Sequence, residues 1–148
     1  MSSRADRIVE SVLIAAPPAR VFEALLDPAQ LEQWWTDAEC ASSDWRIERR
    51  VGGDWESSWR WADGRVVRIG GTIRVLEPPS VLEYDWWDER YPGLDRTVVR
   101  YELRAVGRST QLTVSHSGFA AGRADRADYG GGWSRVLGKI AAFAGALS

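Results

Sequence analysis

The side chain best suited to chemistry in this sequence is its single histidine, His116. An imidazole titrates near neutral pH, so it can orient a ligand carbonyl or act as a general base. The segment QLTVSHSGF alternates Leu112, Val114 and His116 with polar residues, which is typical of a strand with one buried face. A lone inward histidine is more often a hydrogen-bonded core residue. We predict a structural or ligand-orienting role and keep a catalytic role as the alternative.

Aromatic residues are the second unusual feature, because nine tryptophans are more than a chain of 148 residues needs to fill a small core. Several of them, with two tyrosines, recur at every second position of expected strands, which places them on one face. The residues of this inward aromatic set are Trp55, Trp59, Trp61, Tyr84, Trp86 and Tyr101. The pattern predicts a continuous aromatic surface inside the protein.

This surface has two interpretations, a packed core or the wall of a ligand cavity. For any one ring, core packing is the simpler explanation. The set as a whole favours a cavity, and we predict that it binds a small, mainly apolar molecule. Trp34, Trp35 and Trp133 lie in expected helices and are predicted at the mouth, where recognition residues usually lie on a rigid sheet.

Other site chemistries have little support in the sequence. One histidine and one cysteine, Cys40, cannot supply the ligands of a structural zinc site, and no GxSxG motif is present, so we expect no metal and no cofactor. Glu83 and Asp85 alternate with the inward aromatic residues and should face away from them, while Glu10 is ambiguous. Paired-carboxylate catalysis is therefore not expected.

Composition narrows the partners and the compartment. A formal net charge of -2 gives no electrostatic reason to bind nucleic acid. The first residues, MSSRADRIVES, hold no apolar stretch long enough for a signal peptide or membrane anchor, and the lone cysteine can form no disulfide within the chain. We expect a cytoplasmic protein with no membrane span, and the sequence indicates no particular oligomeric state.

The order of expected elements predicts one α+β domain over residues 1–148. A strand at 8–15 precedes two short helices, the second capped by Asp27 with Gln30 three residues later. Alternating segments over 45–118, separated by turn signals, indicate an antiparallel meander with a bend or bulge at Gly70 and Gly71. Apolar residues at helical spacing over 133–147 follow a glycine-rich entry at 130–132. We predict a curved antiparallel sheet of about six to seven strands around a long C-terminal helix.

The same segments carry a resemblance that spans essentially the whole chain. In order, they are IAAPPARVFEALLDPAQLEQWW, GGDWE, GTIRVLEPPSVLEYDWW, LTVSHSGF and GGWSRVLGKIAAF. Together they resemble the SRPBCC superfamily, most closely the small bacterial proteins similar to the C-terminal domain of the heat-shock-protein-90 ATPase activator. The resemblance implies a START-like or Bet-v-like helix-grip fold.

Members of this superfamily bind lipids, sterols, polyketides or other apolar molecules, and a few act as cyclases or hydrolases. The resemblance supplies no catalytic set to transfer to this chain, so function has to be argued from the site. We expect binding of an apolar ligand that is non-enzymatic or only weakly enzymatic. The alternatives are a cyclase-like or hydrolase-like enzyme using His116, and a chaperone-ATPase regulator that acts through its surface.

Overall fold

A computed structural model describes residues 7–36, 40–119 and 126–146, which form seven strands and three helices. The elements in chain order are β1 (Arg7–Ile14), α1 (Pro18–Leu26), α2 (Pro28–Trp34), β2 (Cys40–Ile47), β3 (Asp54–Trp61), β4 (Val66–Glu77), β5 (Val81–Asp88), β6 (Thr97–Val106), β7 (Ser109–Ser117) and α3 (Arg126–Ala146). This order confirms the predicted α+β class and the two short helices after the first strand.

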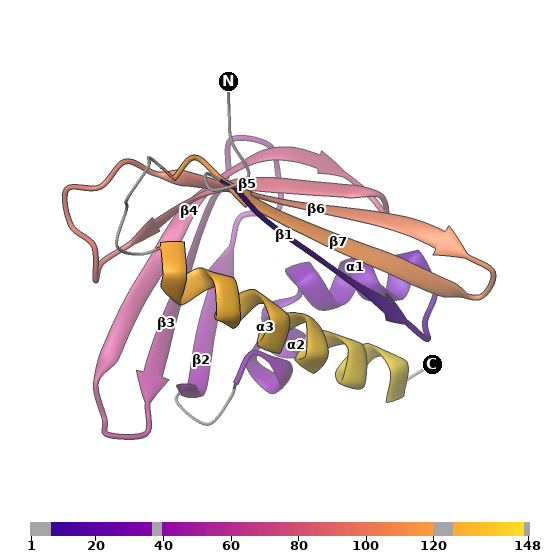
Figure 1. Ribbon diagram of the computed structural model, residues 1–148, viewed down its shortest axis with the longest axis horizontal. Coiled ribbons are helices and arrows are strands. Elements are labelled where there is room, and N and C mark those ends of the chain that lie inside the picture. Colours follow the sequence, from indigo (N-terminus) through magenta and orange to yellow (C-terminus); the bar gives the residue numbers. More distant parts are fainter. Residues whose placement is uncertain (1–6, 37–39, 120–125, 147–148) are drawn as a thin grey trace.

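The strands form one antiparallel sheet in the order β1-β7-β6-β5-β4-β3-β2. Strands β2 to β7 pair with their neighbours in the sequence, as the predicted meander requires, and β1 joins the far edge by pairing with β7. Figure 1 shows the sheet curled into a half-barrel, with α3 lying along its concave side. The predicted helix-grip arrangement is confirmed.

Alternation along the strands places the core inside this curve. On β5 the even-numbered residues from Leu82 to Asp88 are buried, and the odd-numbered residues between them are half-buried. On β7 the same alternation buries Leu112, Val114 and His116. Every second side chain of these strands therefore points toward α3, as the alternation in the sequence predicts.

The two adjacent glycines of β4 allow a close approach between strands. A Cβ added to Gly71 would lie 1.8 Å from the carbonyl oxygen of Asp85 on β5, so no other residue fits there. The Asp85 side chain fills a gap in the ladder, since its Oδ1 accepts a hydrogen bond from the Thr72 N–H at 2.9 Å. The shift in register lies between Ile73 and Val75, beyond the glycines where we predicted it.

Asp27 separates the two short helices, as predicted. Its backbone N–H donates to the Glu23 oxygen at the end of α1, and its Oδ1 accepts from the Ala29 N–H at 3.1 Å to cap α2. Gln30 completes the arrangement by donating from Nε2 to Asp27 Oδ2 at 3.0 Å. One residue thus ends one helix and begins the next.

The substitution Asp27→Ala should lower the free energy of unfolding by about 1 kcal/mol, because the N-cap acceptor is lost. Urea unfolding followed by circular dichroism measures the difference. Glu32→Ala, at an exposed position of α2, is the matched control and should change stability by less than about 0.5 kcal/mol. Equal losses in the two variants would show that the cap does not stabilise α2.

The long helix begins earlier than the sequence suggested. It starts at Arg126, so the glycines at 130–132 lie inside α3, and the prediction that they lead into it is wrong. Glycine costs a helix about 1 kcal/mol per residue, and tertiary packing offsets that cost here. Tyr129 and Trp133, one turn apart, are both buried against the sheet. The buried stripe continues through Leu137, Ile140 and Ala144, and Leu147, also predicted in it, lies outside the described residues.

Candidate functional site

The structure brings the predicted aromatic residues into the space between the sheet and α3. All are buried except Trp61, which is half-buried at the end of β3. The predicted binding residues found there are Trp34, Trp55, Trp59, Trp61, Tyr84, Trp86, Tyr101, His116 and Trp133. We call these residues, together with Trp35, Trp45 and Tyr129, the aromatic cluster.

Trp86 on β5 lies in the middle of the aromatic cluster. Its ring centroid is 5.3 Å from that of Trp55 and 6.0 Å from that of Trp59, both on β3. Across the interior, the ring of Trp133 on α3 is 5.9 Å away. Rings from the sheet and from the helix are therefore in direct contact where a cavity was predicted.

Trp45 and Tyr129 were not predicted in the site, and Trp35 was predicted only at its mouth. Trp35, which follows α2, lies 5.0 Å from the ring of Trp45 and 5.7 Å from that of Trp59. The ring of Trp34 contacts that of Trp35, with centroids 5.3 Å apart, and the Trp34 indole N–H donates to the Ala24 backbone oxygen. Trp34 thus ties α2 to α1, while Trp35 makes most of the ring contacts.

His116 points inward, as predicted, and is fully buried. The Trp133 indole N–H donates to His116 Nδ1 at 2.9 Å, and Nε2 lies 2.6 Å from Thr97 Oγ1. Because an indole N–H can only donate, Nδ1 carries no proton, and the imidazole proton sits on Nε2, which donates to Thr97. His116 is therefore neutral with both nitrogens engaged, which suits a structural or orienting role.

A buried carboxylate that was not predicted from the sequence is linked to this histidine through Tyr129, whose ring centroid lies 4.8 Å from that of His116. Asp88 ends β5 on its inward face, and Arg90 donates to it from Nη2 at 2.6 Å and from Nε at 3.0 Å. Tyr129 donates to Asp88 Oδ2 at 2.5 Å and accepts from the Trp86 indole at 3.1 Å. Burial, together with the Asp88 charge, raises the pKa of Tyr129, so its hydroxyl stays protonated and donates.

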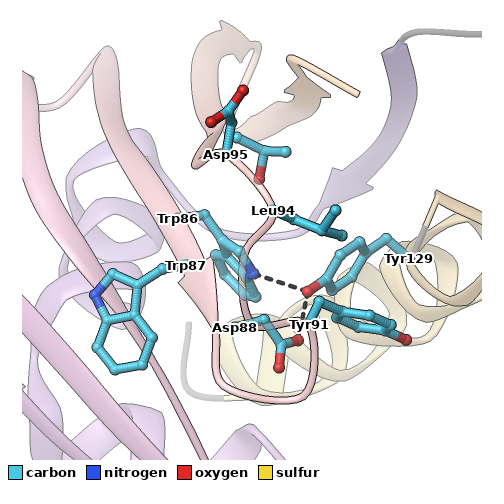
Figure 2. Close-up of a pocket in the computed structure, with 8 residues that line it drawn as sticks. Trp86, Trp87, Asp88, Tyr91, Leu94, Asp95 and Tyr129 are labelled. Atoms are coloured by element: carbon cyan, nitrogen blue, oxygen red, sulfur yellow. Dashed lines mark hydrogen bonds between the residues drawn. The ribbon is translucent and has the colours of Figure 1, made fainter. Parts of the chain in front are cut away.

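A small pocket opens beside these groups, between α3 and the segment that joins β5 to β6. Figure 2 shows Trp86, Asp88 and Tyr129 converging there, while the ring of Trp87 points away from them. The pocket is lined by Trp86, Trp87, Asp88, Tyr91, Leu94, Asp95, Thr97 and Tyr129. Its volume of about 10 Å³ has room for about one water molecule. The aromatic cluster thus reaches the surface through a nearly closed opening.

The acids considered in the sequence lie where alternation predicted. Glu83 and Asp85 lie on the outer face of the sheet, where Glu83 pairs with Arg100 and Asp85 with Arg96. Glu10 is half-buried on the inward side of β1. Within the described residues, no group of three or more His, Cys, Asp or Glu side chains is placed to hold a metal ion. In that part of the chain, no helix is long and apolar enough to cross a membrane.

Comparison with known proteins agrees with this architecture. Residues 15–145 match the family model described as Activator of Hsp90 ATPase homolog 1-like protein. The chain belongs to this family. Its superfamily is SRPBCC, so the predicted resemblance is confirmed. No curated protein matches the chain.

Solved structures similar to this family member share its fold at low sequence identity. Protein CV1439 from Chromobacterium violaceum is 23% identical with a TM-score of 0.78, covering 95% of this chain and 97% of that one. Protein NE0264 from Nitrosomonas europaea is 16% identical with a TM-score of 0.82, covering 96% of each chain. DynU16, a putative protein in the dynemicin biosynthetic locus, is 23% identical with a TM-score of 0.72, covering 93% of this chain and 46% of that one.

Proposed function

We propose that this protein binds a small, mainly apolar molecule, of lipid, aromatic or polyketide-like type, between the sheet and α3, and that it does so in the cytoplasm. The observation that carries the proposal is the pocket at which the aromatic cluster reaches the surface beside Trp86 and Tyr129. Aromatic walls with a few polar tips are typical of sites for such ligands. Here the tips are the hydroxyl groups of Tyr129 and Thr97 and the imidazole of His116.

Entry of a ligand requires movement, because the pocket holds only about one water molecule. The segment between β5 and β6 is the part best placed to move. It contributes Tyr91 and Leu94 to the pocket, and Leu94 is 42% exposed. Displacing it costs little buried apolar contact, and loops on a rigid sheet commonly open in this way. A flat aromatic ligand could then lie among the rings of the aromatic cluster, so that contacts with the ligand replace some of the contacts between rings.

Thermal shift tests this proposal with a panel of fatty acids, sterols, flavonoids and polyketides. A ligand present at about 100 times its Kd stabilises the folded state by about 2.7 kcal/mol. For a chain of this length that raises the melting temperature by roughly 5–10 °C. A panel in which no compound raises it would contradict the proposal.

Two neighbouring tryptophans of β5 provide the matched variants for any compound that binds. Trp86→Ala removes the central ring of the aromatic cluster and should abolish most of the shift. Trp87→Ala removes a half-buried ring that points away from Trp86, Asp88 and Tyr129 and lies against Gly70 on β4. Trp87 borders the pocket, but its ring does not enter the aromatic cluster, so this variant should leave most of the shift intact. Loss of the shift in both variants would place the ligand outside the proposed interior.

The cyclase-like or hydrolase-like alternative has less support. A general base needs a free lone pair, whereas His116 Nδ1 accepts from Trp133 and Nε2 carries the proton given to Thr97. The chaperone-regulator alternative draws on the description of the family. Ligand binding is the proposal that the arrangement of aromatic and polar side chains between the sheet and α3 supports.

A further inference from the structure

One indole in the aromatic cluster differs from its neighbours. The buried indoles that donate their N–H to a described acceptor are those of Trp34, Trp45, Trp55, Trp86 and Trp133. Trp59, on β3, is 8% exposed, and its Nε1–H is buried without a hydrogen-bond partner among the described residues. Buried indole N–H groups usually have a hydrogen-bond partner, so the unpartnered N–H of Trp59 needs an explanation.

A second unpartnered polar atom lies on the same face of the same strand. Ser57 is 1% exposed, and its Oγ has no hydrogen-bond partner in the described part of the chain. Trp45 on β2 and Ile69 on β4 lie opposite Ser57, and the Trp45 indole is already used by Ser43. Cα atoms two residues apart on a strand are about 6.6 Å apart, so one small molecule can reach both groups.

These two polar atoms lower the stability of the ligand-free protein. A buried donor without a partner has lost its hydrogen bonds to water and gained none in return. Alanine at 57 would fill nearly the same space without that cost, and phenylalanine at 59 would keep a smaller aromatic ring without it. A role in recognition explains why polar atoms stand at both positions.

We propose that Ser57 Oγ and Trp59 Nε1 donate hydrogen bonds to an acceptor oxygen of the bound ligand, which is a neutral aromatic ketone or a similar aromatic carbonyl compound. This inference rests on the proposed function. An indole N–H can only donate, so the ligand atom that meets it must be an acceptor.

The surroundings of Trp59 define the rest of the ligand. Its ring contacts those of Trp35 and Trp86, with centroids 5.7 Å and 6.0 Å apart. A ligand that displaced these contacts would meet aromatic rings on several sides, which suits a flat aromatic body. The guanidinium of Arg90 lies 5.9 Å from the Trp59 ring and is already paired with Asp88. A ligand carboxylate would find no uncompensated positive charge there, which favours a neutral carbonyl.

Calorimetric titration with 2-acetonaphthone and 2-isopropenylnaphthalene tests the inference, because the two probes have nearly the same shape but only the first has a carbonyl oxygen. The ketone should bind about tenfold more tightly, as expected for one or two net hydrogen bonds. Ser57→Ala should weaken ketone binding about three- to tenfold and leave the affinity for the isostere unchanged. Trp59→Phe should weaken ketone binding more than isostere binding, because it removes the indole N–H as well as part of the ring that contacts both probes. Trp45→Phe, which removes an indole N–H with an internal partner, should keep the ketone preference.

Melting temperatures of the ligand-free variants give a second readout. Ser57→Ala should keep or raise the melting temperature, since it removes an unpartnered buried group. Trp59→Phe should lower it less than Trp45→Phe does, because both variants lose ring volume but only Trp45→Phe also loses a hydrogen bond. A lower melting temperature for Ser57→Ala would mean that Oγ is already satisfied, for instance by an ordered water, and would overturn the inference.

The binding outcomes separate this inference from the proposed function. Equal affinity of the two probes for the unmodified protein, or a ketone preference that survives both variants, overturns the role of Ser57 and Trp59 and leaves ligand binding standing. If neither probe binds up to its solubility limit while a compound of the thermal-shift panel does bind, this inference is overturned and ligand binding stands. If the panel also raises no melting temperature, the proposed function is overturned, and this inference with it.

Discussion

Asp88→Ala should lower the free energy of unfolding by about 3 kcal/mol, at the low end of the range for breaking a buried ion pair, because the Arg90 side chain retains some exposure to water. Removal of the carboxylate leaves the Arg90 guanidinium without its ion-pair partner and the Tyr129 hydroxyl without its acceptor. Arg90 and Tyr129 line or adjoin the pocket, so the same change should loosen the segment between β5 and β6. Urea unfolding followed by tryptophan fluorescence measures the loss.

Glu56→Ala is the matched control for this prediction. Glu56 also accepts from arginines, Arg46 and Arg68, but on the outer face of the sheet. Exposed pairs of this kind contribute about 1 kcal/mol or less, so the control should lose far less stability than Asp88→Ala. Similar losses for the two variants would mean that the Asp88 network contributes no more than a surface ion pair.

His116→Ala should also cost about 3 kcal/mol, because it leaves a cavity and removes the partners of the Trp133 indole and the Thr97 hydroxyl. His116→Gln is the informative companion, since its amide offers one acceptor and one donor and can replace both hydrogen bonds. We expect His116→Gln to recover more than half of the loss, as measured by thermal and urea unfolding.

The same pair of variants separates the roles assigned to His116. If His116 serves to orient Trp133 and Thr97, His116→Gln should also retain most of the affinity for any ligand found by thermal shift. A glutamine variant as unstable as the alanine variant would contradict the assigned hydrogen bonds. Loss of a measured turnover in His116→Gln, with stability and ligand affinity intact, would instead favour a catalytic imidazole.

The inward positions of Trp59, Trp86 and His116 could be predicted because strand alternation has a fixed period of two. The same rule was available for Asp88, which continues the series Leu82, Tyr84 and Trp86. It was missed because the polar run after Trp87 was assigned to a loop from its first residue. Polar residues usually indicate that a strand has ended. Here the salt bridge with Arg90 allows the charged Asp88 to occupy the last inward position of β5.

Tyr129 was missed, and Trp35 was predicted only at the mouth, for reasons that lie outside local sequence. Three consecutive glycines disfavour a helix by propensity, and only packing against the sheet extends α3 back to Arg126, past Tyr129. Trp35 follows the last residue of α2, where no periodicity assigns a face to it. Its contacts depend on how α2 meets β2, which is a tertiary property.

Alternation also could not predict whether the interior is hollow. It assigns a side chain to a face, but the free volume depends on how rings from β3, β5 and α3 interlock across the core. Centroid distances of 5.3 Å between Trp55 and Trp86 and 5.9 Å between Trp86 and Trp133 show that the rings meet. The binding proposal therefore depends on an interior that opens for its ligand.

The most direct test of that proposal is the nitrogen-15 spectrum of the tryptophan indoles during titration with naphthalene, a probe with no hydrogen-bonding group. We predict that the N–H signals of Trp59, Trp86 and Trp133 move together with a single Kd. Trp87 is the internal control, because its ring points away from Trp86, Asp88 and Tyr129, and its signal should move less than those of the three interior residues. A titration that moves Trp87 while the three interior signals remain fixed would contradict uptake into the aromatic cluster.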